Sequence, residues 1–242
     1  MSEDFQSTLK IIKSRGYWKV HLYPNTIDFL PIEPINKGKE IIKNTSIHLR
    51  GWDYPHFPKQ SFENQNIYVS GDKIEAWVDY DSHKEVWRLY NSGQFIHVFS
   101  LGEDWLMEST WSSNELKKIQ PGTILSIEWS IFLITEIYSF IKNLIEAELY
   151  KSEIALEIVM VGTQNRELTV FDPMRMPLIE KYKSASTEIN FPRKIYEIQE
   201  FKINYLDLAY EQIVYLFNQF NWDNLNKSAI REDQRRLIER RL

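Results

Sequence analysis

The side chains best suited to chemistry gather in one turning segment, residues 46–58. It carries a cation, a carboxylate, an imidazole and large rings around one glycine and two prolines: Arg50, Trp52, Asp53, Tyr54, His56 and Phe57. Large aromatic side chains beside charges, on a segment that must turn, indicate a corner of the core or a recognition surface. Arg50 could form two bonds to a phosphate or carboxylate while Trp52 stacks on a flat ring. The structural alternative is that Arg50 pairs with Asp53 across a turn at Gly51.

A second polar group lies on the hairpin predicted for residues 84–101. Two alternating strands flank residues 91–93, whose sequence Asn-Ser-Gly is typical of a three-residue turn. This turn favours a register in which Arg88 lies opposite Ile96. Three polar side chains then share the face that does not enter the core: Arg88, Tyr90 and Gln94. That face either binds a polar ligand or is a solvated or inter-subunit surface. The two groups together form the ligand or partner surface that the sequence predicts: Arg50, Trp52, Asp53, Tyr54, His56, Arg88, Tyr90 and Gln94.

Four of the five histidines fall in the same region, close to two aspartates: His48, His56, His83 and His97, with Asp53 and Asp81. Imidazole and carboxylate groups together can form a metal site or an acid–base pair. Their spacing matches no known metal signature, such as two histidines one helical turn apart. We therefore expect structural histidines, no metal and no cofactor.

Two of the carboxylates in the most apolar segment, residues 123–149, lie in its interior. Glu128 and Glu136 each fall within a helical repeat of large apolar side chains. A carboxylate in such a position must be paired, protonated or at a polar edge, and Arg50 or Arg88 could be the partner. An ion pair that locks the helix is the structural interpretation. The catalytic alternative is an acid–base site that draws on three side chains: Asp53, His56 and Glu128.

The chain lacks the signatures of common enzyme classes. It contains no glycine-rich nucleotide-binding motif, no zinc-protease helix motif and no nucleophile-elbow motif. It has no cysteine, which excludes disulfides, thiol nucleophiles and cysteine-based zinc sites and fits a reducing cytoplasm. These absences favour a non-enzymatic protein.

Charge and hydropathy narrow the classes of partner. The net charge is -5, and the acidic residues concentrate in the middle of the chain. No domain-wide basic field is therefore present for non-specific nucleic-acid binding. The N-terminus shows no signal peptide. The apolar segment 123–149 is broken by charges, whereas a membrane span needs about 20 mostly apolar residues. We expect a cytoplasmic protein that does not contact membranes.

The pattern of elements predicts a single α+β domain over residues 1–222. Alternating apolar and polar residues indicate a strand at 17–23 and several more over 65–101, which form a mainly antiparallel sheet. Apolar residues at helical spacing indicate a long buried helix within 123–149 and a second core helix over 205–220. We expect the sheet to pack on both helices.

Residues 223–242 differ in composition from the rest of the chain, and we expect them to form a charged helical C-terminal arm. The segment is helix-prone and has only a thin apolar stripe. Its basic side chains are the predicted contacts of a partner protein: Arg231, Arg235, Arg236, Arg240 and Arg241. Acidic residues among them dilute the charge, so an acidic partner protein suits the arm better than a nucleic acid or a membrane. Assembly with further copies of the same chain stays open.

Three blocks of the chain carry a resemblance to a known group of proteins. They are Arg15-Gly-Tyr-Trp18, Leu49-Arg-Gly-Trp-Asp-Tyr-Pro-His56 and Trp87-Arg-Leu-Tyr-Asn-Ser-Gly-Gln-Phe95. Their order resembles an uncharacterised bacterial family, over roughly residues 8–222. Some relatives are joined to Schlafen-type, AlbA-like domains linked to nucleic-acid binding. This resemblance implies no established activity, but it suggests regulation or antiviral defence as a setting.

The function that the sequence favours is a non-enzymatic interaction or accessory subunit of a bacterial multi-protein system. The first alternative is a nucleic-acid or nucleotide binding module that uses four side chains: Arg50, Trp52, Tyr54 and Arg88. The second alternative is the acid–base enzyme described above.

Overall fold

The computed structural model describes residues 3–25, 31–59 and 61–241, and it shows an α+β protein with a large antiparallel sheet. The helices of this part are α1 (Glu3–Ile12), α2 (Lys37–Thr45), α3 (Ile127–Glu146), α4 (Ile198–Asn218) and α5 (Lys227–Ile238). The strands are β1 (Tyr17–Pro24), β2 (Gln65–Ser70), β3 (Lys73–Tyr80), β4 (His83–Tyr90), β5 (Phe95–Ser100), β6 (Ile124–Ser126), β7 (Glu153–Val161), β8 (Glu167–Thr169), β9 (Glu188–Asn190) and β10 (Lys194–Glu197). Two 3-10 helices follow β5, Gly102–Trp105 and Leu116–Lys118.

The large sheet places the N-terminal strand near its centre. The order is β10-β7-β1-β5-β4-β3-β2, and β9 also pairs with β7. Every pair in this sheet is antiparallel, whereas β6 and β8 form a separate parallel pair. The predicted hairpin register is confirmed, because Arg88 lies opposite Ile96 and the Tyr90 amide donates to the Gln94 carbonyl at 2.9 Å.

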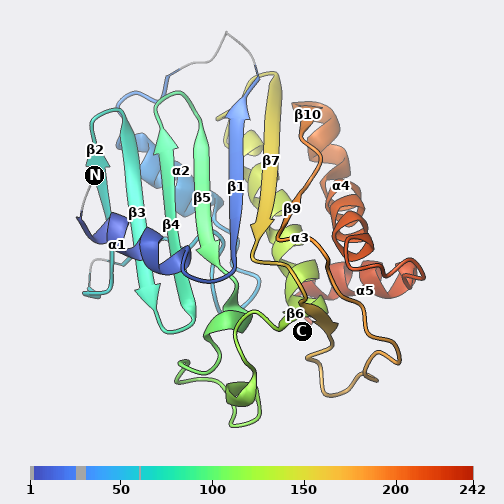
Figure 1. Cartoon of the computed structure of the whole chain (residues 1–242). Coiled ribbons are helices and arrows are strands. Elements are labelled where there is room, and N and C mark those ends of the chain that lie inside the picture. Colours follow the sequence, from blue (N-terminus) through green and yellow to red (C-terminus); the bar gives the residue numbers. More distant parts are fainter. Residues whose placement is uncertain (1–2, 26–30, 60, 242) are drawn as a thin grey trace.

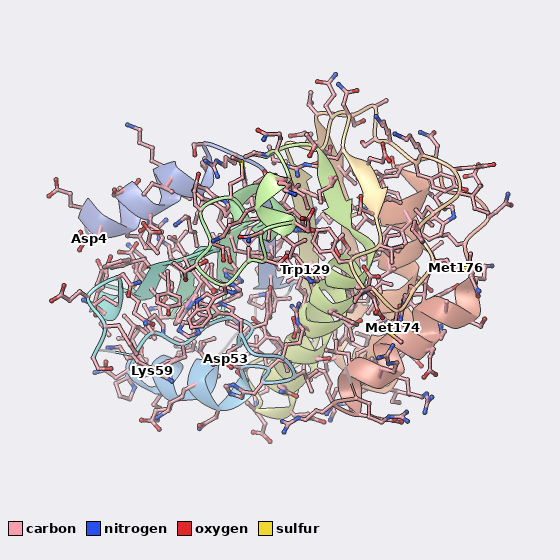
Figure 2. All side chains as sticks on the ribbon, turned by 90° about the horizontal axis from the view of Figure 1, so that it is seen from below. Asp4, Asp53, Lys59, Trp129, Met174 and Met176 are labelled. Atoms are coloured by element: carbon pink, nitrogen blue, oxygen red, sulfur yellow. The ribbon has the colours of Figure 1, made fainter. Side chains whose placement is uncertain are left out.

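Helices cover both faces of the sheet. In Figure 1, α1 lies across one face and α2 and α3 lie on the other, with α4 and α5 beyond β7, at the end of the sheet where β10 lies. Seen from below in Figure 2, Asp4 on α1 and Asp53 beside α2 lie on opposite sides of the sheet. The α1 face has its own small cluster of buried apolar side chains: Phe5, Ile12, Trp77, Val86 and Val98. The larger core lies between the sheet and α3. The two faces of the sheet therefore have separate surroundings.

Helix α3 begins four residues later than the apolar segment 123–149. The Ser126 side chain accepts a hydrogen bond from the Trp129 amide, which is a normal N-cap. Residues 124–126 are held extended because they pair with β8 and because Arg166 donates to the Ile124 carbonyl at 2.9 Å. Fourteen side chains of α3 are buried. Among the described residues, no helix combines the length and the apolar character needed to cross a membrane.

The C-terminal helix lies on the body of the protein, so a projecting arm is not confirmed. Helix α5 packs against α3 and α4, with Ile230 and Leu237 buried. Gln234 donates to Thr135 Oγ1 at 3.3 Å and to the Leu206 carbonyl at 3.2 Å. The thin apolar stripe noted in the sequence is thus sufficient to bury one side of this helix.

A buried ion pair joins the start of β1 to the connections around β6 and β8. Arg166 donates to both carboxylate oxygens of Asp104, at 2.7 and 2.5 Å, and both side chains are 1% exposed. Asp104 also accepts the backbone amides of Gly16 at 2.8 Å and Gly122 at 2.7 Å. Because these groups satisfy each other in a dry environment, the pair fixes how this end of the sheet is closed.

Candidate functional site

A cavity of about 700 Å³ opens at the end of the sheet where β5 ends and α3 begins. Its walls come from residues 50–54, the β3–β4 turn, the connection after β5 and the first half of α3. This is the lower end of the sheet in Figure 1. Five of the predicted site residues lie in or beside it: Arg50, Trp52, Asp53, Tyr54 and His56. The segment of residues 46–58 therefore forms one side of this cavity through residues 50–54.

Arg50 is committed to a carboxylate on α3. Its Nε donates to Glu136 Oε1 at 2.9 Å, and its Nη2 donates to Glu136 Oε2. The Glu136 side chain is 1% exposed, and burial raises its pKa, although Arg50 acts in the opposite direction. The expected pairing of Arg50 with Asp53 is therefore wrong. Asp53 instead lies 2.6 Å from His48 Nδ1 and 3.9 Å from His56 Nδ1.

Replacing Arg50 with methionine is expected to lower the free energy of unfolding by about 1–3 kcal/mol near pH 8, since it leaves the buried Glu136 carboxylate without its partner, whereas Arg50 itself is partly exposed. The loss of Arg50 removes an influence that lowers the pKa of Glu136, so this pKa rises further. A carboxyl group whose pKa is higher in the folded state loses stabilisation as pH rises through that value. The destabilisation relative to wild type should therefore be smaller near pH 5 than near pH 8, as measured by urea unfolding.

The matched control is Lys142→Met, which removes the partner of Glu146 on the exposed side of the same helix. We expect it to change stability by less than about 0.5 kcal/mol at either pH. An Arg50 variant that is equally destabilised at both pH values would contradict the role assigned to Glu136.

Trp52 is enclosed by two imidazole rings. His56 and His83 stack on its indole with ring centroids 4.1 Å away in each case. Its Nε1 donates to Glu85 Oε1 at 2.8 Å. Packing against this cluster lowers the pKa of His83, so the ring is neutral at pH 7 although part of it meets solvent. Trp52 acts as a wall, because neither face of its ring is open to stack on a ligand.

Glu85 connects the wall of the cavity to the sheet. It accepts hydrogen bonds from Trp52, from the His56 amide at 3.1 Å and from His97 Nε2 at 2.8 Å. Burial raises the pKa of Glu85, but the bond from His97 and nearby positive charge outweigh burial, and the pKa lies below its usual value. Glu85 was not among the site residues predicted from the sequence. Strand alternation could have identified it, because Glu85 and Trp87 are two residues apart in β4 and their side chains therefore point to the same, core-facing side of the strand.

Two polar atoms of the wall have no hydrogen-bond partner among the described residues. They are Tyr54 Oη and His97 Nδ1, and both residues line the cavity. Burial raises the pKa of Tyr54 well above its ordinary value, so the phenol is a neutral donor. A buried donor without a partner costs about 1–3 kcal/mol. Both atoms are almost fully buried, so a ligand in the cavity would reach them only if the wall moved.

The charges of the wall do not favour an anionic ligand. Its cations are Arg50, bound to Glu136, and Lys84, bound to Asp79. Its carboxylates are more numerous: Asp53, Glu85, Glu103 and Glu136. A phosphate would therefore meet no uncommitted cation on the wall and would lie near several negative charges.

The structure does not bring Arg88, Tyr90 and Gln94 to the cavity. Strand alternation turns Arg88 to the α1 face, where its Nε donates to Glu75 at 2.6 Å and its guanidinium lies 4.3 Å from the Phe5 ring centre. The other two side chains of this group also have partners there. Gln94 lies 2.8 Å from His21, and the Lys73 ammonium lies over the Tyr90 ring. The sheet separates them from Arg50, so the two predicted groups do not form one surface.

Glu128 is likewise separate from Asp53 and His56. Its carboxylate accepts the backbone amides of Phe171 at 3.0 Å and Asp172 at 3.3 Å, which holds the loop after β8 against α3. It lines a second cavity, described below, and the acid–base set that the sequence suggested is therefore not assembled.

The arginines of the C-terminal segment divide into two sets. Arg231 pairs with Asp207, Arg235 with Glu232 and Arg241 with Glu239. By contrast, no carboxylate of the described residues pairs with Arg236 or Arg240. Of the five arginines predicted to contact a partner protein, only Arg236 and Arg240 therefore lack a carboxylate partner among the described residues.

The described part of the chain contains no group of three or more His, Asp or Glu side chains placed to hold a metal ion. Comparison with known proteins finds no matching family model, no matching curated protein and no matching solved structure. The geometry of the cavity is therefore the basis for the proposed function.

Proposed function

We propose that this protein is a non-enzymatic accessory subunit that recognises a small, largely apolar and uncharged organic molecule in the cavity beside Arg50 and Glu136. The observation that carries the proposal is the cavity of about 700 Å³ itself, whose wall is mostly apolar and whose two cations, Arg50 and Lys84, are each bound to a carboxylate. Sites for small molecules are mostly apolar hollows of about 300–1,000 Å³ with few polar groups.

The apolar part of the wall defines the body of the ligand. Large side chains from the sheet and from α3 line it, among them Phe99, Leu125, Trp129 and Leu133. Figure 2 shows Trp129 on α3, near the centre of the molecule in this view. A ligand with an apolar body would cover these side chains. A net negative charge on the ligand would be unfavourable beside the carboxylates of the wall.

The hydrogen bonds and ion pairs of the wall carboxylates support a binding role. Glu136 is occupied by Arg50, Glu85 by three donors and Asp53 by His48. A general base needs a free lone pair within reach of the substrate proton. Membership of a bacterial multi-protein system, with antiviral defence as one setting, remains a proposal that draws on the sequence resemblance alone.

The test uses N-phenyl-1-naphthylamine, a neutral fluorophore that brightens in apolar sites. We expect saturable one-to-one binding in the micromolar range and no displacement by ATP or by a single-stranded oligonucleotide. Leu133→Trp fills the cavity and should weaken binding at least about tenfold. The matched control is Leu9→Trp, a partly buried leucine on α1 at the opposite face of the sheet, which should leave binding unchanged.

Two results would overturn the proposal. The first is the absence of saturable binding, or binding that Leu133→Trp does not affect. The second is displacement by ATP or the oligonucleotide with a steep salt dependence, which would favour the nucleic-acid or nucleotide module instead.

A further inference from the structure

A second cavity, of about 600 Å³, lies between the start of α3, the loop after β8 and α5. Its apolar wall includes Trp129, Phe132, Phe171 and Met174, and Arg236 of α5 closes one side. The rings of Trp129 and Phe171 meet edge to face with centroids 5.1 Å apart. Of the residues that line this groove, Trp129 also lines the cavity beside Arg50; the others do not.

The loop that forms one side of the groove is held firmly in place. Glu128 accepts two backbone amides at its start, as described above. Arg175 Nη1 donates to Asp233 Oδ2 of α5 at 2.7 Å, and Asp172 Oδ1 accepts the Met174 amide at 2.9 Å. Hydrogen bonds to charged groups of this kind are stronger than neutral ones. The loop therefore presents its side chains in a defined orientation.

Large apolar side chains of this loop project into solvent. Met174 is 91% exposed, Met176 is 86% exposed and Ile179 is 99% exposed. Figure 2 places Met174 and Met176 on the loop beside the C-terminal helices. Neighbouring exposed apolar side chains mark interaction sites, and methionine adapts its shape to different partners.

The groove wall contains two carboxylates and two arginines. Glu128 accepts two backbone amides, and Asp172 pairs with Arg175, which leaves Arg236 as the cation without a carboxylate partner among the described residues. The Nε of Arg236 donates to the Arg241 carbonyl at 3.2 Å. Its neighbour Arg235 differs, because Glu232 and Glu239 occupy it. An unpaired guanidinium beside an apolar wall complements a carboxylate that follows an apolar side chain.

We propose that this groove, with Met174, Met176 and Arg236, docks a short segment of a partner protein that presents an apolar side chain next to a carboxylate. The apolar side chain lies against Phe132 and Phe171, and the carboxylate bonds to Arg236. The proposal goes beyond ligand binding in the first cavity. Of the five arginines that the sequence predicted as partner contacts, the proposal retains Arg236, which lines the groove.

The test selects phage-displayed random peptides of about 12 residues on the full chain. We expect enrichment of peptides in which an aromatic or aliphatic residue lies within a few positions of Asp or Glu. The best peptide, made synthetically, should bind with a micromolar Kd by fluorescence anisotropy. Arg236→Glu should weaken it at least about tenfold, and selection on that variant should enrich Lys or Arg instead. Met174→Ser should weaken the same peptide without changing the charge preference.

Lys10→Glu is the matched control, because it makes the same charge change at an exposed position of α1 on the other face of the sheet. Peptide binding should be unaffected, and thermal unfolding should show that each variant is folded. Binding of N-phenyl-1-naphthylamine should also be unchanged in Arg236→Glu, which separates this proposal from the first cavity. A selection without a carboxylate preference, or binding that Arg236→Glu does not weaken, would overturn the proposal. Self-association or binding to anionic vesicles that Arg236→Glu abolishes would overturn the assignment of a partner protein.

Discussion

Replacing Asp104 with alanine is expected to lower the free energy of unfolding by about 3–5 kcal/mol, the largest effect that we expect of a single substitution in this chain. Asp104 compensates the guanidinium of Arg166, and both side chains are almost fully buried. The substitution would leave a buried cation without its carboxylate. It would also remove the acceptor of the Gly16 and Gly122 amides. Urea unfolding of the purified variant measures the change.

Glu108→Ala is the matched control for Asp104→Ala. Glu108 is a carboxylate in the same connection and also pairs with an arginine, Arg15, but its side chain is half exposed. An ion pair in solvent contributes about 0–1 kcal/mol, so this variant should remain close to wild type. If the two variants were destabilised by similar amounts, the buried pair would not be what closes this end of the sheet.

Gly16→Ala is the second substitution with a large expected effect, about 3 kcal/mol, although it adds only one methyl group. A Cβ at position 16 would meet Arg166 Nη2, and it would lie 2.5 Å from Leu101 Cδ1 and 2.8 Å from Asp104 Oδ2. Overpacking a tight site costs about 1–3 kcal/mol by itself. Here the added carbon must also displace the buried ion pair. The melting temperature should fall by about 6–12 °C, measured by circular dichroism.

Gly51→Ala is the control for this substitution. A Cβ at Gly51 would meet no heavy atom within 4 Å, although Gly51 belongs to the same turning segment as Arg50 and Trp52. Its stability should lie within about 0.5 kcal/mol of wild type. A Gly16 variant as stable as the Gly51 variant would show that the Arg166–Asp104 pair tolerates movement.

The sequence was most informative where the relevant interactions are local. The register of the β4–β5 hairpin was predicted from the turn at residues 91–93 and is confirmed by the pairing of Arg88 with Ile96. The α+β class and the antiparallel sheet are confirmed by the strand pairs. The need of Glu136 for a partner was also predicted, because a carboxylate inside an apolar helix must be compensated, and Arg50 was among the candidates named.

The partners of other charges were not predictable in this way. Arg88 was placed with Arg50 in one predicted ligand or partner surface, but the sheet places them on opposite faces. Glu128 was grouped with Asp53, but it binds the loop at Phe171. Both residues do bind partners, as charged side chains were expected to do, but not the partners or neighbours predicted. Sequence patterns did not determine which distant part of the fold each side chain meets.

By itself, the sequence determined the alternation of the strands, the turn that sets the hairpin register and the apolar repeat of α3, because these depend on the conformational preferences of neighbouring residues. Only the tertiary structure decided that Arg166 meets Asp104, that Arg50 meets Glu136 and that Tyr54 and His97 line one cavity. These contacts join residues far apart in the chain. Their formation depends on the packing of whole layers, for which short-range patterns carry no information.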